Sequence, residues 1–189
     1  MLDIFSKVAE NQPASEAPPH YFIEVGSYKY PIGHELKGVL ELLGQHNHIH
    51  WHNGGKWSMI DLLMGCIKYT GECAITLSSY AFSEKPARIV CDLRQQGVIT
   101  NLRCLIDSRV DTRSASALTL LQNSCDVCTL TDTHAKVTLL HHAGGFLTIT
   151  GSANYTTNKR LEAGIITSDS AAYHFHLNWL EYAMGSKKT

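Results

Sequence analysis

The residues most suited to chemistry lie between positions 133 and 166, in THAKVTLLHHAGGFLTITGSANYTTNKRLEAGII. His134 and Lys136 are two positions apart, so on a strand an imidazole and an ammonium would project from one face into the same space. That pairing is suited to a phosphate. In the Gly-Ser-x-Asn run that follows, Gly151 permits a tight backbone, while Ser152 and Asn154 supply hydrogen-bond donors for a phosphoryl oxygen.

Glu162 stands just before an apolar, strand-like segment and could accept a hydrogen bond from Nδ1 of His134. That contact would fix the tautomer of the imidazole and leave Nε2 as a nucleophile. An isolated His-x-Lys pair is typical of a surface strand, whereas the ordered set of His-x-Lys, Gly-Ser-x-Asn and Glu is far more specific. The pattern therefore predicts phosphoryl chemistry centred on His134.

A second candidate group is a row of histidines at alternate positions: His46, His48, His50 and His52. Strand geometry places such residues in one row, about 6 to 7 Å apart. Because the ligands of a zinc ion must converge at about 2 Å, four same-face strand positions hardly make a zinc site unaided. A solvated strand face or cleft rim, a metal site and a direct substrate contact all remain open. We expect an accessory role, as a weakly basic wall of the cleft.

The formal net charge of −1 gives no bulk attraction to nucleic acid, so a polyanion site needs a local cluster of cations. We expect candidates at strand ends or in adjacent loops: Arg103, Arg109, Arg113, Lys136, Lys159 and Arg160. The predicted substrate-binding residues are Arg109, Lys159, Arg160 and Tyr155. Scattered surface charge is the alternative for each cation. Aromatic residues here could stack on bases or serve as packing anchors: Trp51, Trp57 and Tyr155.

The elements that must position these residues alternate between strands and helices. Helices are predicted in segments 34–44, 54–71, 83–97, 112–123 and 168–184, with Ser58 and Asp61 forming a capping box. Strands are predicted in 46–52, 73–79, 98–107, 125–130, 134–140, 146–150 and 164–167. This alternation predicts an α/β fold with a mixed, mostly parallel sheet flanked by helices on both faces.

A length of 189 residues, with 44% hydrophobic and 17% charged residues, is typical of one globular domain. We expect a flexible N-terminal arm over 1–20, an α/β domain over 21–185 and a disordered tail over 186–189. With no long apolar run and no recognisable leader, we expect a cytoplasmic protein without a membrane partner. The six cysteines suit reduced thiols; the Cys125 and Cys128 pair leaves a metal or redox role open, although no metal or cofactor is expected.

The ordered motif, HAK followed by GSAN and NKRLEAGII, resembles the H-x-K-x4-D and G-S-x-N signature of the phospholipase D superfamily. It is most similar to the small single-motif, nuclease-like members found in bacteria and mobile elements. The resemblance implies a metal-independent phosphodiesterase in which His134 attacks phosphorus, giving a phosphohistidine, while a second histidine protonates the leaving oxygen. Lys136, Ser152 and Asn154 would stabilise the phosphoryl charge, and Glu162 would orient His134.

The sequence departs from the family pattern at His141, where the family carries Asp, and in the segment before Gly151, which is about three residues longer. It also contains one motif, whereas the family's site uses two. A homodimer that presents both copies of His134 to one phosphate would complete the fold and the site. The resemblance thus implies a homodimeric nuclease. The alternative is a catalytically silent module that binds nucleic acid or another phosphate ligand; lipid headgroup hydrolysis is disfavoured because no interfacial helix is evident.

Overall fold

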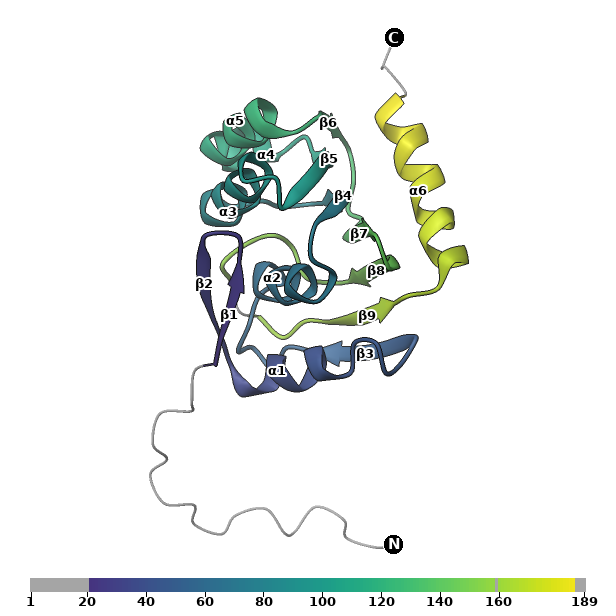
Figure 1. Cartoon of the computed structure of the whole chain (residues 1–189). Coiled ribbons are helices and arrows are strands. Elements are labelled where there is room, and N and C mark those ends of the chain that lie inside the picture. Colours follow the sequence, from purple (N-terminus) through teal and green to yellow (C-terminus); the bar gives the residue numbers. More distant parts are fainter. Residues whose placement is uncertain (1–20, 159, 186–189) are drawn as a thin grey trace, which may run out of the picture.

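The computed structural model describes residues 21–158 and 160–185 (Figure 1). The predicted arm over 1–20, the tail over 186–189 and Lys159 lie outside these residues. The described chain contains the following elements: β1 (Tyr21–Val25), β2 (Tyr28–Ile32), α1 (His34–Glu41), β3 (His48–His52), α2 (Met59–Thr70), β4 (Cys73–Ser79), α3 (Glu84–Gln95), β5 (Ile99–Asp107), α4 (Val110–Arg113), α5 (Ala115–Ser124), β6 (Val127–Thr131), β7 (Val137–His142), β8 (Gly145–Gly151), β9 (Ala163–Thr167) and α6 (Ser170–Gly185).

One large sheet has the strand order β3-β9-β8-β7-β4-β5-β6. The pairs β4 with β5 and β5 with β6 are parallel, and the other four pairs are antiparallel. The mixed α/β class is therefore confirmed, but the expectation that parallel pairs would dominate is corrected. The reason is local: β7 and β8 are joined by a tight reversal, and β9 then returns antiparallel beside β8.

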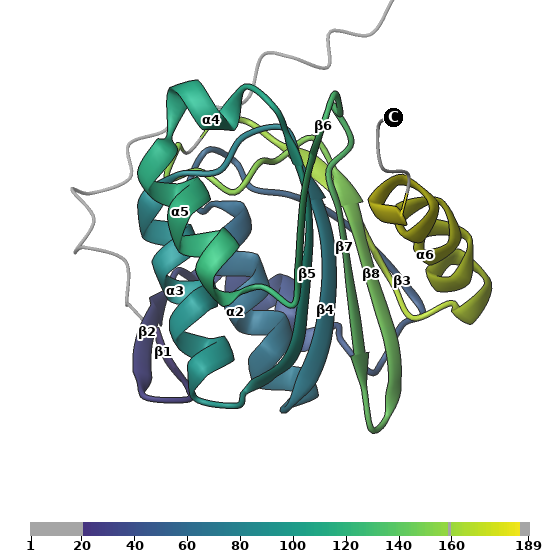
Figure 2. The ribbon, with the colours of Figure 1, turned by 90° about the horizontal axis from the view of Figure 1, so that it is seen from above.

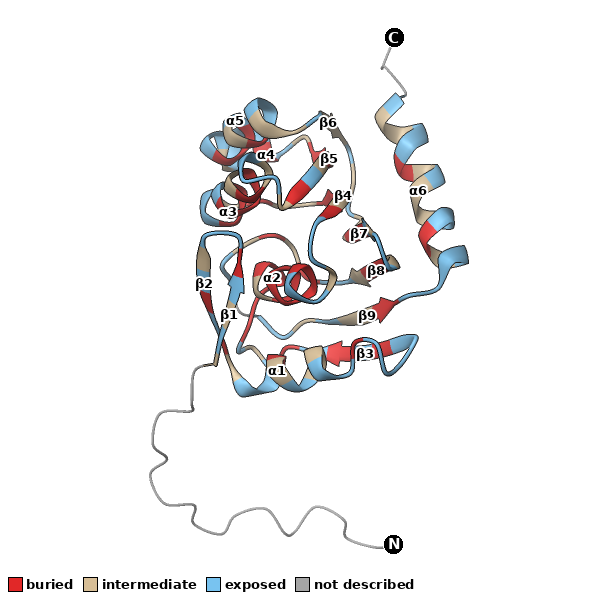
Figure 3. Ribbon diagram, viewed as in Figure 1, coloured by how far each residue is buried: buried red, intermediate tan, exposed pale blue. Residues whose placement is uncertain are grey.

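Helices cover both faces of the sheet, as the sequence predicted (Figure 2). The helices α2, α3 and α5 lie on one face, and the buried side of α2 is almost continuous (Figure 3). On the opposite face, α6 contributes Tyr173 and Leu180 to an apolar cluster with Leu105, Val137 and Leu139. Within the described ranges, no helix has both the length and the apolar character that crossing a bilayer requires.

Several helix boundaries follow the local signals in the sequence. The predicted capping box at the start of α2 is confirmed, with the backbone N of Ser58 donating to Asp61 Oδ2 at 2.7 Å. Asp169 similarly accepts a hydrogen bond from the backbone N of Ala171 at the start of α6, at 3.0 Å. The helix predicted in 112–123 is instead divided at Ser114 into α4 and α5.

A separate hairpin of β1 and β2 was not predicted. Gly26 has a φ of +55°, which suits its place in the two-residue turn between the strands. The hydroxyl of Tyr30 donates to Asp61 Oδ1 at 2.8 Å and thereby ties this hairpin to α2. A sequence signal was present, because the aromatic runs YFIEV and YKYPI are separated only by Gly-Ser.

The segments that carry the candidate site converge at one edge of the sheet. Since β4, β5 and β6 are parallel neighbours, their C-terminal ends meet at this edge. Val137, the first residue of β7, pairs with both Ser78 of β4 and Thr150 of β8. Gly151, the last residue of β8, pairs with Gly164 of β9. Residues far apart in sequence are thereby placed side by side.

Candidate active site

His134 and Lys136 lie in the segment between β6 and β7, and not within a strand as predicted. What brings their side chains together is a direct contact: Lys136 Nζ donates to the His134 carbonyl oxygen at 2.6 Å and lies 3.2 Å from Nδ1 of the ring. The imidazole is exposed, while Lys136 is partly buried. Burial lowers the pKa of Lys136, and the negative charge of Glu162 opposes this effect.

The contact between Lys136 and His134 has a consequence for the imidazole tautomer. An ammonium group only donates hydrogen bonds, so Nδ1 of His134 must act as the acceptor. A neutral imidazole in this arrangement carries its proton on Nε2. For Nε2 to act as a nucleophile, Lys136 must therefore leave Nδ1, and a bound phosphoryl oxygen is a suitable new partner for its ammonium group.

The ring of Tyr80, the residue directly after β4, gathers the basic side chains of the site. The centroid of the His134 imidazole lies 4.6 Å from the Tyr80 centroid. Arg109 Cζ lies 4.5 Å from that centroid, and Lys136 Nζ lies 5.3 Å from it. The negative face of an aromatic ring attracts such cations. Tyr80 thus contacts three basic side chains, one from the turn after β5 and two from the segment between β6 and β7.

Asp107, the last residue of β5, is a fully buried carboxylate that contacts Arg109 of this group. It accepts hydrogen bonds from Arg109 Nε at 2.6 Å and Nη2 at 3.0 Å, and from the backbone N of Thr133 at 3.1 Å. The bonds from the Arg109 guanidinium are the main reason that the pKa of Asp107 is lowered to about 2. Because Thr133 precedes His134, Asp107 fixes the segment that carries the imidazole.

Ser152 and Glu162 form a pair at the ends of β8 and β9. Ser152 Oγ donates to Glu162 Oε2 and accepts a hydrogen bond from the backbone N of Ala163 at 3.2 Å. This corrects the expectation that Glu162 orients His134, because the carboxylate is engaged by Ser152 while Nδ1 of His134 faces Lys136. The pairing of β8 with β9 places Ser152 beside Ala163, and so next to Glu162.

Asn154 is anchored to the segment that follows β4. Its Oδ1 accepts a hydrogen bond from the backbone N of Ala81 at 3.1 Å and one from Ser79 Oγ at 3.4 Å. Since the carbonyl oxygen of the side chain is turned toward this segment, the Nδ2 group is the part that can serve a phosphoryl oxygen. The structure thus joins the Gly-Ser-x-Asn motif to Tyr80 through residues 79–81.

A buried amide, Asn53, holds the segment that leads to Glu162. Its Nδ2 donates to the carbonyl oxygens of Trp57 and Arg160, each at 2.7 Å. Its Oδ1 accepts from the backbone N atoms of Gly55 at 3.0 Å and Glu162 at 2.9 Å. All four hydrogen-bonding positions of the amide are used, which explains how a polar residue 2% exposed is tolerated in the core.

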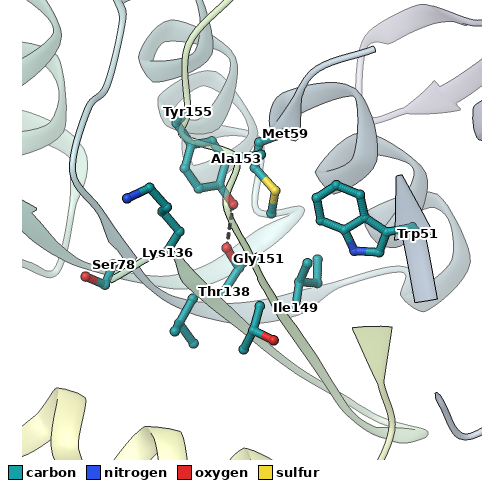
Figure 4. A pocket seen from close by; sticks show the side chains of 11 residues that line it. Trp51, Met59, Ser78, Lys136, Thr138, Ile149, Gly151, Ala153 and Tyr155 are labelled. Carbon is teal, nitrogen blue, oxygen red and sulfur yellow. Dashed lines mark hydrogen bonds between the residues drawn. The ribbon is translucent and has the colours of Figure 1, made fainter. Parts of the chain in front are cut away.

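The floor of the site is a closely packed pocket of about 10 Å³, roughly the space for one water molecule (Figure 4). Within it, the hydroxyl of Tyr155 lies 2.8 Å from Thr138 Oγ1. The Tyr155 ring is 2% exposed and stacks on Phe82 with a centroid distance of 4.8 Å. The expectation that Tyr155 binds substrate is therefore corrected, because the side chain at this position of the motif points into the core. Trp51 and Trp57 are also buried and pack on each other.

Of the other predicted substrate-binding residues, Arg160 lines an open cleft of about 230 Å³. Its lining includes Asn53, Tyr80, Asn154, Arg160 and Glu162. Arg109 and Arg160 are exposed, whereas Lys159 lies outside the described residues. Two other arginines differ: Arg103 bonds Glu181 of α6 at 2.7 Å, and Arg113 donates to the Tyr80 hydroxyl at 3.0 Å.

The histidine row lies on the edge strand β3, where His48, His50 and His52 are exposed and alternate with buried Ile49 and Trp51. Nδ1 of His48 lies 2.9 Å from Thr167 Oγ1. In the described part of the chain, no three His, Cys, Asp or Glu side chains converge closely enough to hold a metal ion. His52 pairs with Ala163, which places one end of the row next to the strand end that carries Glu162.

His141, at the position of the family Asp, lies near the far end of β7 from the candidate site. Its ring stacks on Phe146 with a centroid distance of 4.9 Å. It pairs across the sheet with Ala74 near the start of β4, whereas the site lies beyond the other end of that strand. The departure at this position therefore falls outside the contacts that surround His134.

Two residues of the site were missed in the sequence: Tyr80 and Asp107. Both follow or end an apolar strand, in ITLSSY and CLID, where polar side chains emerge at the edge of a parallel pair. That placement was a usable signal. Their joint role was not readable from the sequence, because it depends on the order of β4, β5 and β6 in the sheet.

No family model matches the sequence, and no curated protein is similar to it in sequence. The structure is similar to that of NucT from Helicobacter pylori, with a TM-score of 0.53 and 12% identity over 74% of this chain and 97% of that chain. It is also similar to polyphosphate kinase from Porphyromonas gingivalis, with a TM-score of 0.51 and 12% identity over 79% of this chain and 26% of that chain.

The architecture and site together define an α/β protein that presents a phosphate-suited group of side chains at one edge of a mixed sheet. The chain shares its fold with these two structures, which supports the α/β fold that the resemblance of the sequence motif implied.

Proposed function

We propose that the protein is a metal-independent phosphodiesterase, a homodimeric cytoplasmic nuclease that acts through a phosphohistidine intermediate. The observation that carries this proposal is the exposed His134 imidazole, which contacts Lys136 and follows Thr133, whose backbone N donates to Asp107. Asn154, which follows the neighbouring strand end, supplies a further donor through its Nδ2 group, and Ser152 lies beside it with its hydroxyl bonded to Glu162. The six free thiols support a reducing compartment.

The first chemical step would begin when a substrate phosphate draws the ammonium of Lys136 away from Nδ1 of His134. With Nδ1 free, the imidazole takes the other tautomer, its proton moving from Nε2 to Nδ1 through solvent. Nε2 of His134 then attacks phosphorus, a nitrogen-phosphorus bond forms, and the bond from phosphorus to the leaving oxygen breaks. The leaving oxygen takes a proton from the partner's His134. Water, deprotonated by the same imidazole, then displaces His134 and releases the phosphomonoester. Lys136 and Asn154 would stabilise charge on the phosphoryl oxygens throughout.

The dimer is required by the chemistry, because one protomer provides one histidine of the motif. Two histidines that share one phosphate must act in different protonation states, one as nucleophile and one as acid. A twofold axis at the site supplies the second imidazole, because it brings the same residue of both protomers together. Mixing wild-type protein with His134→Ala and allowing subunits to exchange would therefore leave about a quarter of the activity in an equal mixture, and not half.

The test of the enzymatic proposal uses bis(4-nitrophenyl) phosphate in the presence of EDTA, from about pH 5 to pH 8, the window in which histidine changes charge. Turnover should survive EDTA and be lost in His134→Ala. The matched control is His141→Ala, which removes an exposed imidazole at the other end of β7 and should retain turnover. Activity that disappears with EDTA, or that persists in His134→Ala, would contradict the proposal.

A second candidate function, a silent module that binds nucleic acid or another phosphate ligand, is supported by one contact. Glu162 is engaged by Ser152, so the carboxylate expected at Nδ1 of His134 is directed elsewhere. If the purified protein is folded and dimeric but shows no turnover at any pH in this window, while it still binds a labelled oligonucleotide, the binding module is the better description.

A further inference from the structure

Arg113 joins the site through Tyr80, although it lies in the short helix α4 and belongs to no recognised motif. Its Nη1 donates to the Tyr80 hydroxyl at 3.0 Å, and its Cζ lies 5.6 Å from the ring centroid. Arg109, on the same ring, is 4.5 Å from the centroid. Two guanidinium groups thus surround the ring that also contacts the His134 imidazole.

The charges around Tyr80 are unevenly balanced. The carboxylate of Asp107 is paired with Arg109, at 2.6 Å. Arg113 meets a neutral phenol, and Lys136 meets a carbonyl oxygen and a ring nitrogen. The carboxylates of Asp132 and Glu162 accept from the hydroxyls of Ser108 and Ser152. The cluster therefore has hydrogen-bond donors for a second anion, in addition to the phosphate that reacts at His134.

The guanidinium groups also have the accessibility that a ligand needs. Half of the Arg109 side chain is exposed, and Arg113 is exposed. Arginine is suited to phosphate because its planar fork can donate two parallel hydrogen bonds. The Tyr80 ring is already surrounded by cations, so it serves to hold the arginines in place and not to stack a base.

We propose that Tyr80, Arg109 and Arg113 form a second phosphate subsite that holds a neighbouring phosphate of the same strand while His134 reacts with the first. This inference rests on the proposed function and specifies its substrate class: a chain of phosphodiesters, that is, a polynucleotide. Phosphates along one strand of duplex nucleic acid recur about every 3.4 Å of helix axis, so a strand that occupies the His134 site brings further phosphates close to the same ring. An isolated diester has no group for this subsite.

The experiment compares Arg113→Ala with wild type on two substrates, bis(4-nitrophenyl) phosphate and a short labelled single-stranded oligonucleotide. The specificity ratio, kcat/KM for the oligonucleotide over kcat/KM for the small diester, should fall about tenfold in Arg113→Ala, as loss of one charge-assisted phosphate contact predicts. The logarithmic slope of oligonucleotide kcat/KM against salt, from about 50 to 200 mM, should become shallower by about one. The matched control, Arg88→Ala, removes an exposed arginine of α3 that pairs with Glu84; it should keep the ratio and the slope.

Each outcome bears on the subsite separately from the enzymatic proposal. An equal loss on both substrates, or an unchanged ratio and salt slope, would overturn the subsite. If wild type hydrolyses neither substrate, the proposed enzymatic function fails, and the subsite is then judged by fluorescence anisotropy with the same oligonucleotide. A lower affinity and a shallower salt slope for Arg113→Ala supports it, and identical binding to wild type overturns it. Urea unfolding of each variant verifies that the fold is intact.

Discussion

The indole ring of Trp51 lies against Gly151, so that a Cβ atom on Gly151 would come within 3.0 Å of its Cζ2 atom and within 2.6 Å of the Ala163 carbonyl oxygen. The motif therefore requires glycine at this position because there is no space for a side chain. The backbone conformation is not the reason, since φ of Gly151 is not in the left-handed region. Trp51 comes from the histidine segment, whose buried side supports the motif. The exposed histidines of that segment are a separate feature.

The first prediction concerns Gly164, which packs even more closely on this indole. A Cβ atom there would lie 2.6 Å from Trp51 Cζ2 and would also contact the Thr150 backbone. Gly164→Ala should lower the free energy of unfolding by about 1–3 kcal/mol or more, as for other overpacked cores. Urea denaturation followed by tryptophan fluorescence measures this. Gly38→Ala is the matched control, since a Cβ in that helical position meets no atom within 4 Å and should be neutral or stabilising. Equal stability of both variants would refute the packing role.

The second prediction concerns Asp107 and acid stability. The folded-state pKa of Asp107 is lowered to about 2, below the ordinary value of 3.8, so its contribution is present above pH 4 and is lost as pH falls toward 2. Asp107→Asn should therefore lower the free energy of unfolding by about 2 kcal/mol at pH 7. The difference from wild type should shrink as the pH approaches 2. Guanidinium unfolding curves across this pH range check both points.

The control for this prediction is Asp111→Asn in α4, which removes an exposed carboxylate nearby. It should leave the unfolding free energy within about 0.5 kcal/mol of wild type. If Asp107→Asn lowers the free energy of unfolding by the same amount at every pH, the effect comes from altered packing or hydrogen bonding and not from the loss of the charge.

The sequence was informative where a feature depends on residues close together in the chain. The capping box of Ser58 and Asp61, the strand β4 and the reversal between β7 and β8 all follow from local patterns. The contact between Lys136 and His134 likewise joins two residues of one short motif. The resemblance built on them agrees with the fold.

The features that could not be predicted depend on which strands become neighbours. Tyr80 and Asp107 are separated by 27 positions and meet at the site only because β4 and β5 are parallel. Glu162 was expected to accept a hydrogen bond from His134, but the pairing of β8 with β9 places it next to Ser152, whose hydroxyl donates to it. Tyr155 lies beside Asn154 in the motif, and only the packing of Phe82 against it shows that it faces the core.

The last prediction concerns Asn53, whose amide joins β3, the start of α2 and the segment before Glu162. Asn53→Asp keeps the size of the side chain but replaces the NH2 group with an oxygen that faces the carbonyl oxygens of Trp57 and Arg160. The substitution removes two N–H donors and places an oxygen opposite two carbonyl oxygens, at a position that is only 2% exposed to solvent.

We expect Asn53→Asp to lower the free energy of unfolding by about 3 kcal/mol or more at pH 7, and by less at low pH, where a protonated carboxyl can again donate one hydrogen bond. The exposed Asn123→Asp in α5 makes the same chemical change at the surface and should have little effect. Urea unfolding of both variants at pH 7 and pH 4 provides the comparison. If Asn53→Asp proves as mild as Asn123→Asp, or if acid fails to reduce its cost, then the amide does not hold Arg160 and Glu162 in place, and the position of these two residues beside the cleft must be maintained by other contacts.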